Sequence, residues 1–137
     1  MAYLALDAVS AAVYTALNVS ALTTLATGGV GDHIAQTTSF PYVWFEVRER
    51  DVRGFGTGGL PEVELRVHTF STYEGAKEAQ SVAQKAIQLL KDVSLTITGY
   101  TQAGKVFYDE TIPIYGEILN GVQVIEIVSL FRIYAEE

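Results

Sequence analysis

The chain has 137 residues, about the length of one domain, so we expect a single unit over residues 1–137. It contains no cysteine, which excludes a disulfide framework and a thiolate metal site. The 16 acidic and 9 basic residues give a net charge of -7, which argues against a protein that holds nucleic acid by neutralising phosphates. Because only 18% of the residues are charged and 49% are hydrophobic, we expect part of the surface to contact other subunits.

The first predicted element is an amphipathic helix over residues 4–17. Its apolar positions recur three or four residues apart: Leu4, Ala8, Ala12, Val13, Ala16 and Leu17. This stretch follows no basic region and polar residues interrupt it, so we expect neither a signal peptide nor a membrane span. A short turn over residues 20–26 should stop at Gly28 and Gly29, because glycine adopts the left-handed conformation that ends a helix.

Two alternating strands are predicted next. Pro41 should begin a strand over residues 42–50, because proline is tolerated where a strand starts but cannot donate into its middle. The odd positions Val43, Phe45 and Val47 should face the core, and Tyr42, Trp44, Glu46 and Arg48 the other side. Residues 62–69 alternate in the same way. The four glycines between the two strands predict a long hairpin connection over residues 51–61.

A second main helix is predicted to begin at Ser71, because Ser71-Thr72-Tyr73-Glu74 matches the sequence pattern of a capping box. In this motif the Ser71 hydroxyl accepts a hydrogen bond from the Glu74 N–H, and the Glu74 carboxylate accepts one from the Ser71 N–H. One apolar stripe follows: Ala76, Ala79, Val82, Ala83, Ala86, Ile87 and Leu90. The helix should therefore lie with that stripe against the sheet.

Three further strands are predicted in the C-terminal third. Residues 93–98 alternate again, a turn follows at 102–104, and residues 105–115 form a strand that Pro113 marks as an edge or a bulge. Residues 121–135 are apolar on both faces: Ile125, Ile127, Phe131 and Ile133 on one, and Val122, Val124, Val128 and Leu130 on the other. A strand of this kind is central in a sheet or is covered by another chain.

This order of elements predicts an α+β fold, an antiparallel sheet with two main helices packed on one face. The opposite face would display large apolar side chains: Tyr42, Trp44, Phe70, Val122, Val128 and Leu130. An apolar patch of that size usually marks a contact with a partner.

No motif in the chain predicts a catalytic, cofactor or metal site. His33 next to Asp32, and His68 near Glu62 or Glu64, lack the spacings of metal ligands. The glycine-rich run over residues 54–59 leads into Leu60-Pro61 and a strand, not into the helix N-terminus that a phosphate loop requires. The interleaved carboxylates and arginines of the first hairpin are better explained as cross-strand ion pairs than as paired catalytic carboxylates.

Three segments together resemble one known family. They are Gly31-Asp32-His33-Ile34-Ala35-Gln36, then Phe40-Pro41-Tyr42-Val43, then His68-Thr69-Phe70-Ser71-Thr72-Tyr73-Glu74-Gly75-Ala76-Lys77-Glu78-Ala79. The pattern is similar to the tail completion, or tail terminator, family of long-tailed bacteriophages and phage-derived gene transfer agents. The similarity extends from the first helix to the final strand.

The resemblance implies a virion component that is not an enzyme, is assembled in the cytoplasm of a bacterial host and is located in the neck region of the tail. It implies a ring, commonly a homohexamer, at the head-proximal end of the tail tube. The ring would stop tube growth and join the tail to the head through a neck (stopper) protein. Its partners would be its own copies, the tail tube protein and the stopper; DNA would pass through the lumen without specific binding, and no membrane would be involved.

We expect the subunits to meet head to tail through sheet edges and through the apolar face at Trp44, Val128 and Leu130. The glycine-rich loop would act as an adaptable arm, with Phe55 as its apolar anchor and Arg53 beside it. Two alternatives stay open. One is another neck ring component, a stopper or an adaptor, and the other is a small-ligand-binding or enzymatic α+β domain that uses Glu62 or His68.

Overall fold

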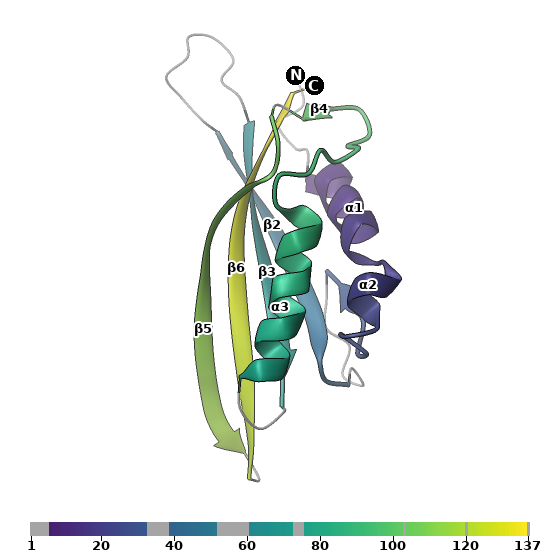
Figure 1. Ribbon diagram of the computed structural model, residues 1–137. Helices are drawn as coiled ribbons and strands as arrows, with labels where there is room; N and C mark the ends of the chain where they lie inside the picture. The colour runs from purple at the N-terminus through teal and green to yellow at the C-terminus, as the bar shows by residue number, and fades with distance from the viewer. Residues whose placement is uncertain are drawn as a thin grey trace.

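The structure is a computed structural model that describes residues 6–32, 39–51, 61–72, 76–102, 104–119 and 121–136. Its elements follow one another as α1 (Leu6–Leu17), α2 (Ser20–Thr23), β1 (Val30–Gly31), β2 (Tyr42–Asp51), β3 (Pro61–Ser71), α3 (Lys77–Leu90), β4 (Thr101–Gln102), β5 (Phe107–Leu119) and β6 (Val122–Glu136). The helices lie together on one side of a curled sheet (Figure 1). This is the mixed α+β architecture that the sequence predicts. Across the described ranges, no helix is long and apolar enough to cross a membrane.

The strands are arranged in the order β1-β2-β3-β6-β5, and β4 pairs with the end of β6. The pairs β2/β3, β3/β6 and β5/β6 are antiparallel, as predicted. The prediction of an antiparallel sheet is wrong at one strand, β1, which runs parallel to β2 with Val30 opposite Val43. A two-residue strand is too short to carry an alternating pattern, so the sequence gives no sign of it.

Close backbone contacts fix β1 against the start of β2. The Gly28 N–H donates to the Pro41 carbonyl at 2.8 Å, and the Val43 N–H donates to the Gly29 carbonyl at 3.0 Å. A Cβ at Gly28 would lie only 1.7 Å from the Ser39 carbonyl oxygen, so no larger residue fits there. Gly29 has φ = 96°, which confirms the predicted left-handed glycine after the second helical turn.

The core lies between the sheet and the helices. Helices α1, α2 and α3 and strands β2, β3 and β6 all contribute buried side chains, among them Val9, Val13, Leu17, Leu22, Val43, Phe45, Val63, Leu65, Val67, Val82, Ala86, Leu90, Phe131 and Ile133. The alternation predicted for β2 and β3 and the apolar stripe predicted for α3 are confirmed, because these are the residues that face one another. The spacing of apolar residues along each of these elements therefore shows which of its faces packs against the neighbouring layer.

The capping box predicted at Ser71 is wrong. Ser71 is the last residue of β3, opposite Ile125 of β6, and α3 begins only at Lys77. The Ser71 hydroxyl is buried and donates to Glu78 Oε1 at 2.8 Å. Ala76 occupies the N-cap position without a side-chain cap, and Glu74 lies outside the described residues. Pairing with β6 extends the strand past the point where the local motif would end it.

The strand predicted over residues 93–98 is absent, because the side chain of Gln102 takes up backbone groups that a ladder would otherwise pair. The Leu95 N–H donates to Gln102 Oε1 at 2.7 Å, and Gln102 Nε2 donates to the Val93 carbonyl at 3.0 Å. The Val106 N–H also donates to the Val93 carbonyl. The segment therefore crosses the end of the sheet as an irregular connection.

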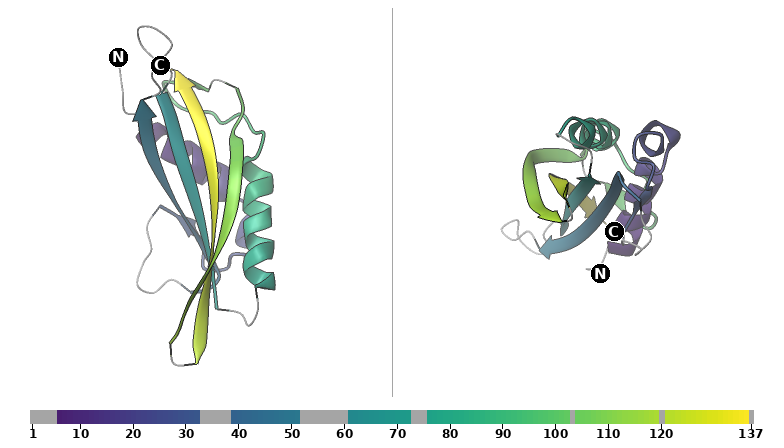
Figure 2. Two further views of the ribbon diagram at one scale, coloured as in Figure 1. Left: turned by 90° about the vertical axis from the view of Figure 1, so that its left-hand side faces the viewer. Right: turned by 90° about the horizontal axis from the view of Figure 1, so that it is seen from below.

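Strands β5 and β6 form a long hairpin at one edge of the sheet. Pro113 lies within β5 opposite Ile127, in an edge strand among the described residues, which is the first of the two places that its sequence predicts. The register shifts twice along the pair, between Tyr108 and Glu110 and between Tyr115 and Ile118, so neither irregularity falls at Pro113 itself. Strand β6 lies between β3 and β5, which confirms its predicted central place. Pairing with β3 stops at Ile125, so Val122 and Gln123 pair with β5 alone. The end of the hairpin projects beyond α3 (Figure 2, left).

Candidate assembly interface

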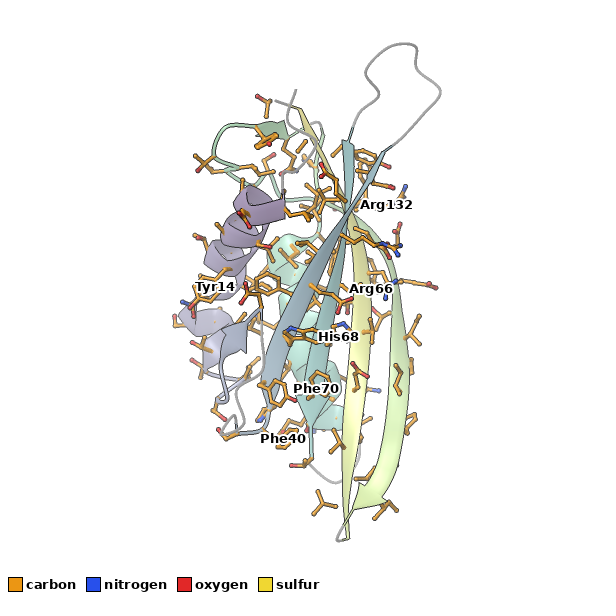
Figure 3. The ribbon with its side chains drawn as sticks, turned by 180° about the vertical axis from the view of Figure 1, so that it is seen from behind. Tyr14, Phe40, Arg66, His68, Phe70 and Arg132 are labelled. Atoms are coloured by element: carbon orange, nitrogen blue, oxygen red, sulfur yellow. The ribbon has the colours of Figure 1, made fainter. Side chains whose placement is uncertain are left out.

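One face of the sheet has no described element over it. The helices pack on the other face, and Figure 3 looks onto the open one, which we call the uncovered face. Cross-strand register places its side chains in rows, taken from β2 through β3 and β6 to β5. The rows are Tyr42-Phe70-Glu126-Ile114, Trp44-His68-Val128-Ile112, Glu46-Arg66-Leu130-Glu110 and Arg48-Glu64-Arg132-Phe107. The first two rows are mainly apolar and the last two mainly charged.

Stacked aromatic rings dominate the apolar half, by which we mean Phe40 together with the first two rows. The rings of Tyr42 and Phe70 stack with centroids 4.9 Å apart, and those of Trp44 and His68 at 4.5 Å. Phe40 extends the group, with its centroid 5.2 Å from that of Tyr42. These rings are only partly buried by their neighbours, and Phe40 is 38% exposed. Burying aromatic surface is the usual source of stability at a protein interface.

The charged half contains the ion pairs that the interleaved sequence predicts. Arg48 Nη2 lies 2.5 Å from Glu64 Oε2, and Arg66 Nε lies 3.3 Å from Glu64 Oε1. Arg66 also reaches Glu46, at 3.8 Å. Burial alone would raise the pKa of Glu64, but hydrogen bonds and charge from Arg48 and Arg66 lower it below its ordinary value. Glu64 is therefore held in its charged form.

A second polar cluster lies where β5 meets the far end of β6. Arg132 donates to both carboxylate oxygens of Asp109 at 3.0 Å, and the Tyr134 hydroxyl donates to Glu62 Oε1 at 3.0 Å. The hydrogen bond with Asp109 raises the pKa of Arg132, and burial followed by the bond to Glu62 raises the pKa of Tyr134. The guanidinium also lies over the ring of Phe107, 5.7 Å from its centroid. These contacts fix one end of the face.

His68 has different neighbours from those expected. Its Nδ1 lies 2.6 Å from Glu126 Oε2 and its Nε2 lies 3.5 Å from Glu46 Oε2, whereas Glu62 and Glu64 bond elsewhere. His68 Nε2 is buried and has no hydrogen-bond partner among the described residues. The partners come from β2 and β6, strands that register brings to either side of β3.

The geometry gives no support to a ligand site built on Glu62 or His68. The two residues are six positions apart on one strand, which separates their Cα atoms by about 20 Å. A hollow on this face is lined by Glu46, Arg48, Glu64 and Arg66, whose charges already pair with one another. Within the part of the chain that the structure describes, no group of three or more histidine, cysteine or acidic side chains could hold a metal ion.

The structure places three of the five predicted interface residues on the uncovered face. Trp44 and Leu130 are half-buried, and Trp44 Nε1 donates to the Asp32 carbonyl at 2.9 Å. Val128 is only 8% exposed, so it supports its neighbours and offers little area of its own. Arg53 and Phe55 lie in residues 52–60, outside the described residues, so the role of the glycine-rich arm stays a prediction from the sequence.

Two exposed side chains of the apolar half were not predicted. Ile112 and Ile114 lie on β5, opposite Val128 and Glu126, and are 42% and 43% exposed. They lie on either side of Pro113, and a proline at this position interrupts the strand pattern in the sequence. The spacing of two residues between them is the signal that could have placed both on one face.

The projecting end of the β5–β6 hairpin is also apolar. Tyr115 is 59% exposed, Ile118 67% and Val122 45%. Gln123 braces the bulge by donating from Nε2 to the Gly116 carbonyl at 3.1 Å. The hairpin end and the two isoleucines thus expose large apolar side chains in two neighbouring regions of the β5 edge, and exposed apolar groups that gather in this way usually mark a contact with a partner.

Comparisons with known proteins agree with this picture. The family model of tail completion protein gp17 matches residues 11–111. Among solved structures, the fold is similar to a chain of a structure described as the virion of a native gene transfer agent (GTA) particle. That match has a TM-score of 0.79 and covers 99% of this chain and 100% of that one at 18% sequence identity, so the likeness is one of fold. A comparison with curated protein sequences finds no match.

Proposed function

The chain belongs to the family of tail completion protein gp17, a family of structural tail proteins, and we propose that its copies form a ring at the head-proximal end of a tail tube. The ring ends the growth of the tube and joins the tail to the head. Its axial partners are the last ring of the tube protein and a stopper protein of the neck. A hexamer is the expected stoichiometry.

The observation that carries this proposal is the uncovered apolar half. Each Å² of apolar surface removed from water contributes about 25 cal/mol, so side chains such as Phe40, Ile112 and Ile114 favour a state in which another chain covers them. The projecting hairpin lies at the β5 edge, whereas the aromatic rings of β2 lie at the other edge. Two different surfaces on one chain suit a head-to-tail contact, the type that closes a ring.

The charge balance supports a channel for DNA. The described acidic side chains of the uncovered face pair mainly with arginines of the same chain, and the net charge of the chain is -7. A chain with this excess of acidic residues attracts phosphates weakly, so a polyanion can pass through such a ring without binding tightly to it. The same reasoning applies to any ring of the neck, so position in the particle separates a terminator from a stopper or an adaptor.

A pair of matched variants tests the proposal. Ile112→Glu places a charge in the apolar half, and Tyr14→Glu places one at an equally exposed position on α1, at the left of the sheet in Figure 3. In cells that produce particles, we expect Ile112→Glu to give separate heads and tails of irregular length, and Tyr14→Glu to give normal particles by electron microscopy.

Both side chains are more than 40% exposed, so each purified variant should keep its free energy of unfolding within about 0.5 kcal/mol. If Ile112→Glu particles have joined heads and tails of normal length, the apolar half is not the ring contact and the proposal fails.

A further inference from the structure

The sheet has two edges with unpaired backbone groups. Strand β5 pairs with β6 on one side and with no described strand on the other. Strand β2 pairs with β1 only at Val43 and Trp44, so its outer edge from Phe45 to Asp51 has no described partner. Open edges of this length are templates for pairing with another chain.

The directions of these two edges match. Strand β2 is antiparallel to β3, β3 to β6, and β6 to β5, so β2 and β5 run in opposite directions. In a ring, a rotation relates one copy to the next and preserves the direction along the axis. With the strands along that axis, the β5 edge of one copy meets the β2 edge of the next as an antiparallel pair. The charged rows then lie beside charged rows and the apolar rows beside apolar rows.

The charges on the two edges are complementary. Glu110 lies on β5 opposite Leu130, faces the uncovered side and is exposed, and it makes no ion pair with the described residues. Arg48 lies on the same face of β2 with 63% of its side chain exposed. Its contact with Glu64 uses one nitrogen of a guanidinium that has five N–H donors, so it can bind a second carboxylate.

The possible length of pairing agrees on the two strands. On β2, the partner β1 blocks the edge at Trp44 and leaves Phe45–Asp51 open. On β5, Pro113 has no N–H to donate, so a ladder that begins near Phe107 stops there. The two open stretches are therefore of similar length, and each ends at an identifiable block.

We propose that β5 of one copy adds to the β2 edge of the next copy, with Glu110 opposite Arg48, so that one sheet continues around the ring. This inference rests on the proposed ring and specifies how its subunits meet. The occupant of both edges is a second copy of this chain. The ladder supplies backbone hydrogen bonds, and the Glu110–Arg48 pair fixes its register.

Disulfide trapping tests the contact directly, because the chain has no cysteine of its own. The double variant Arg48→Cys with Glu110→Cys is built into particles, which are purified, oxidised and run on a gel without reductant. Residues opposite each other in a sheet have Cα atoms within the roughly 7 Å that a disulfide spans. We expect a ladder of cross-linked species that extends to the subunit number of the ring.

The control is Arg48→Cys with Gln84→Cys, which moves one thiol to the exposed side of α3 and should give monomers only. Joined particles without a ladder would overturn the edge pairing and leave the ring function intact. Absence of the chain from the head–tail junction would overturn the ring, and the edge pairing with it.

A charge reversal gives an independent readout. Glu110→Arg places two guanidinium groups opposite each other, and we expect at least a tenfold lower yield of joined particles, with the unfolding temperature of the isolated chain unchanged. A yield equal to that of the unmodified chain would overturn the proposed register.

Discussion

Glu64 is the best-connected charged residue of the uncovered face. It accepts hydrogen bonds from Arg48 of the neighbouring strand β2 and from Arg66 of its own strand, while burial removes most of its contact with water. Hydrogen bonds between charged groups contribute about 1.5–3 kcal/mol each when they are shielded. Removing the charge of Glu64 should therefore weaken the pairing of β2 with β3.

We expect Glu64→Gln to lower the free energy of unfolding by about 1–2 kcal/mol at pH 7. The pKa of Glu64 is lowered from 4.5 in the folded chain, so its contribution is present above the unfolded value and is lost as the pH falls through the folded value. The difference between the two proteins should shrink below about pH 4.5. Denaturant titrations at pH 7 and pH 3, with the exposed Glu110→Gln as a control, measure it. A difference that is constant with pH would contradict the account.

The β5–β6 hairpin differs from the rest of the sheet in its support. Ile125 to Phe131 of β6 pair with both β3 and β5, whereas Val122 and Gln123 pair with β5 alone, and the end of the hairpin extends past α3. A two-stranded hairpin by itself is at best marginally stable in water. The projecting end, with its exposed Tyr115 and Ile118, should therefore open more easily than the remainder of the same strand.

Hydrogen exchange of the isolated chain tests this difference within a single strand. We expect the amides of residues 122–124 to exchange at least about tenfold faster than those of residues 125–131, because local opening needs less free energy there. The second stretch is the internal control. Equal protection along the whole of β6 would show that the end is already covered in the isolated chain.

For the molecule as a whole, the sequence predicts those elements that bury one face against a single neighbouring layer and leave the other face more exposed. Strands β2 and β3 and helix α3 show their period because every second or every third to fourth side chain is buried. The sequence does not predict β1 or β4, which are too short to show a repeat of apolar residues. It also does not predict that residues 93–98 are irregular. There the side chain of Gln102 replaces a strand partner.

The uncovered face could be predicted in outline for the same reason. Trp44 and Leu130 follow from strand parity, because residues two apart share a face. The contact of His68 with Glu126 could not be predicted, since it joins residues 58 apart in the chain and depends on β6 lying beside β3. The exposed position of Ile112 was not predicted, because Pro113 interrupts the alternation of apolar and polar residues along this part of the chain.

Electron cryo-microscopy of purified particles tests the central claim most directly. The account predicts a closed ring of copies of this fold between the last ring of the tail tube and the neck. In it, Tyr42, Phe70 and Ile112 of each copy lie within about 4 Å of another chain. A map that places the fold elsewhere in the particle, or that places it at the junction with this face open to solvent, would contradict the account.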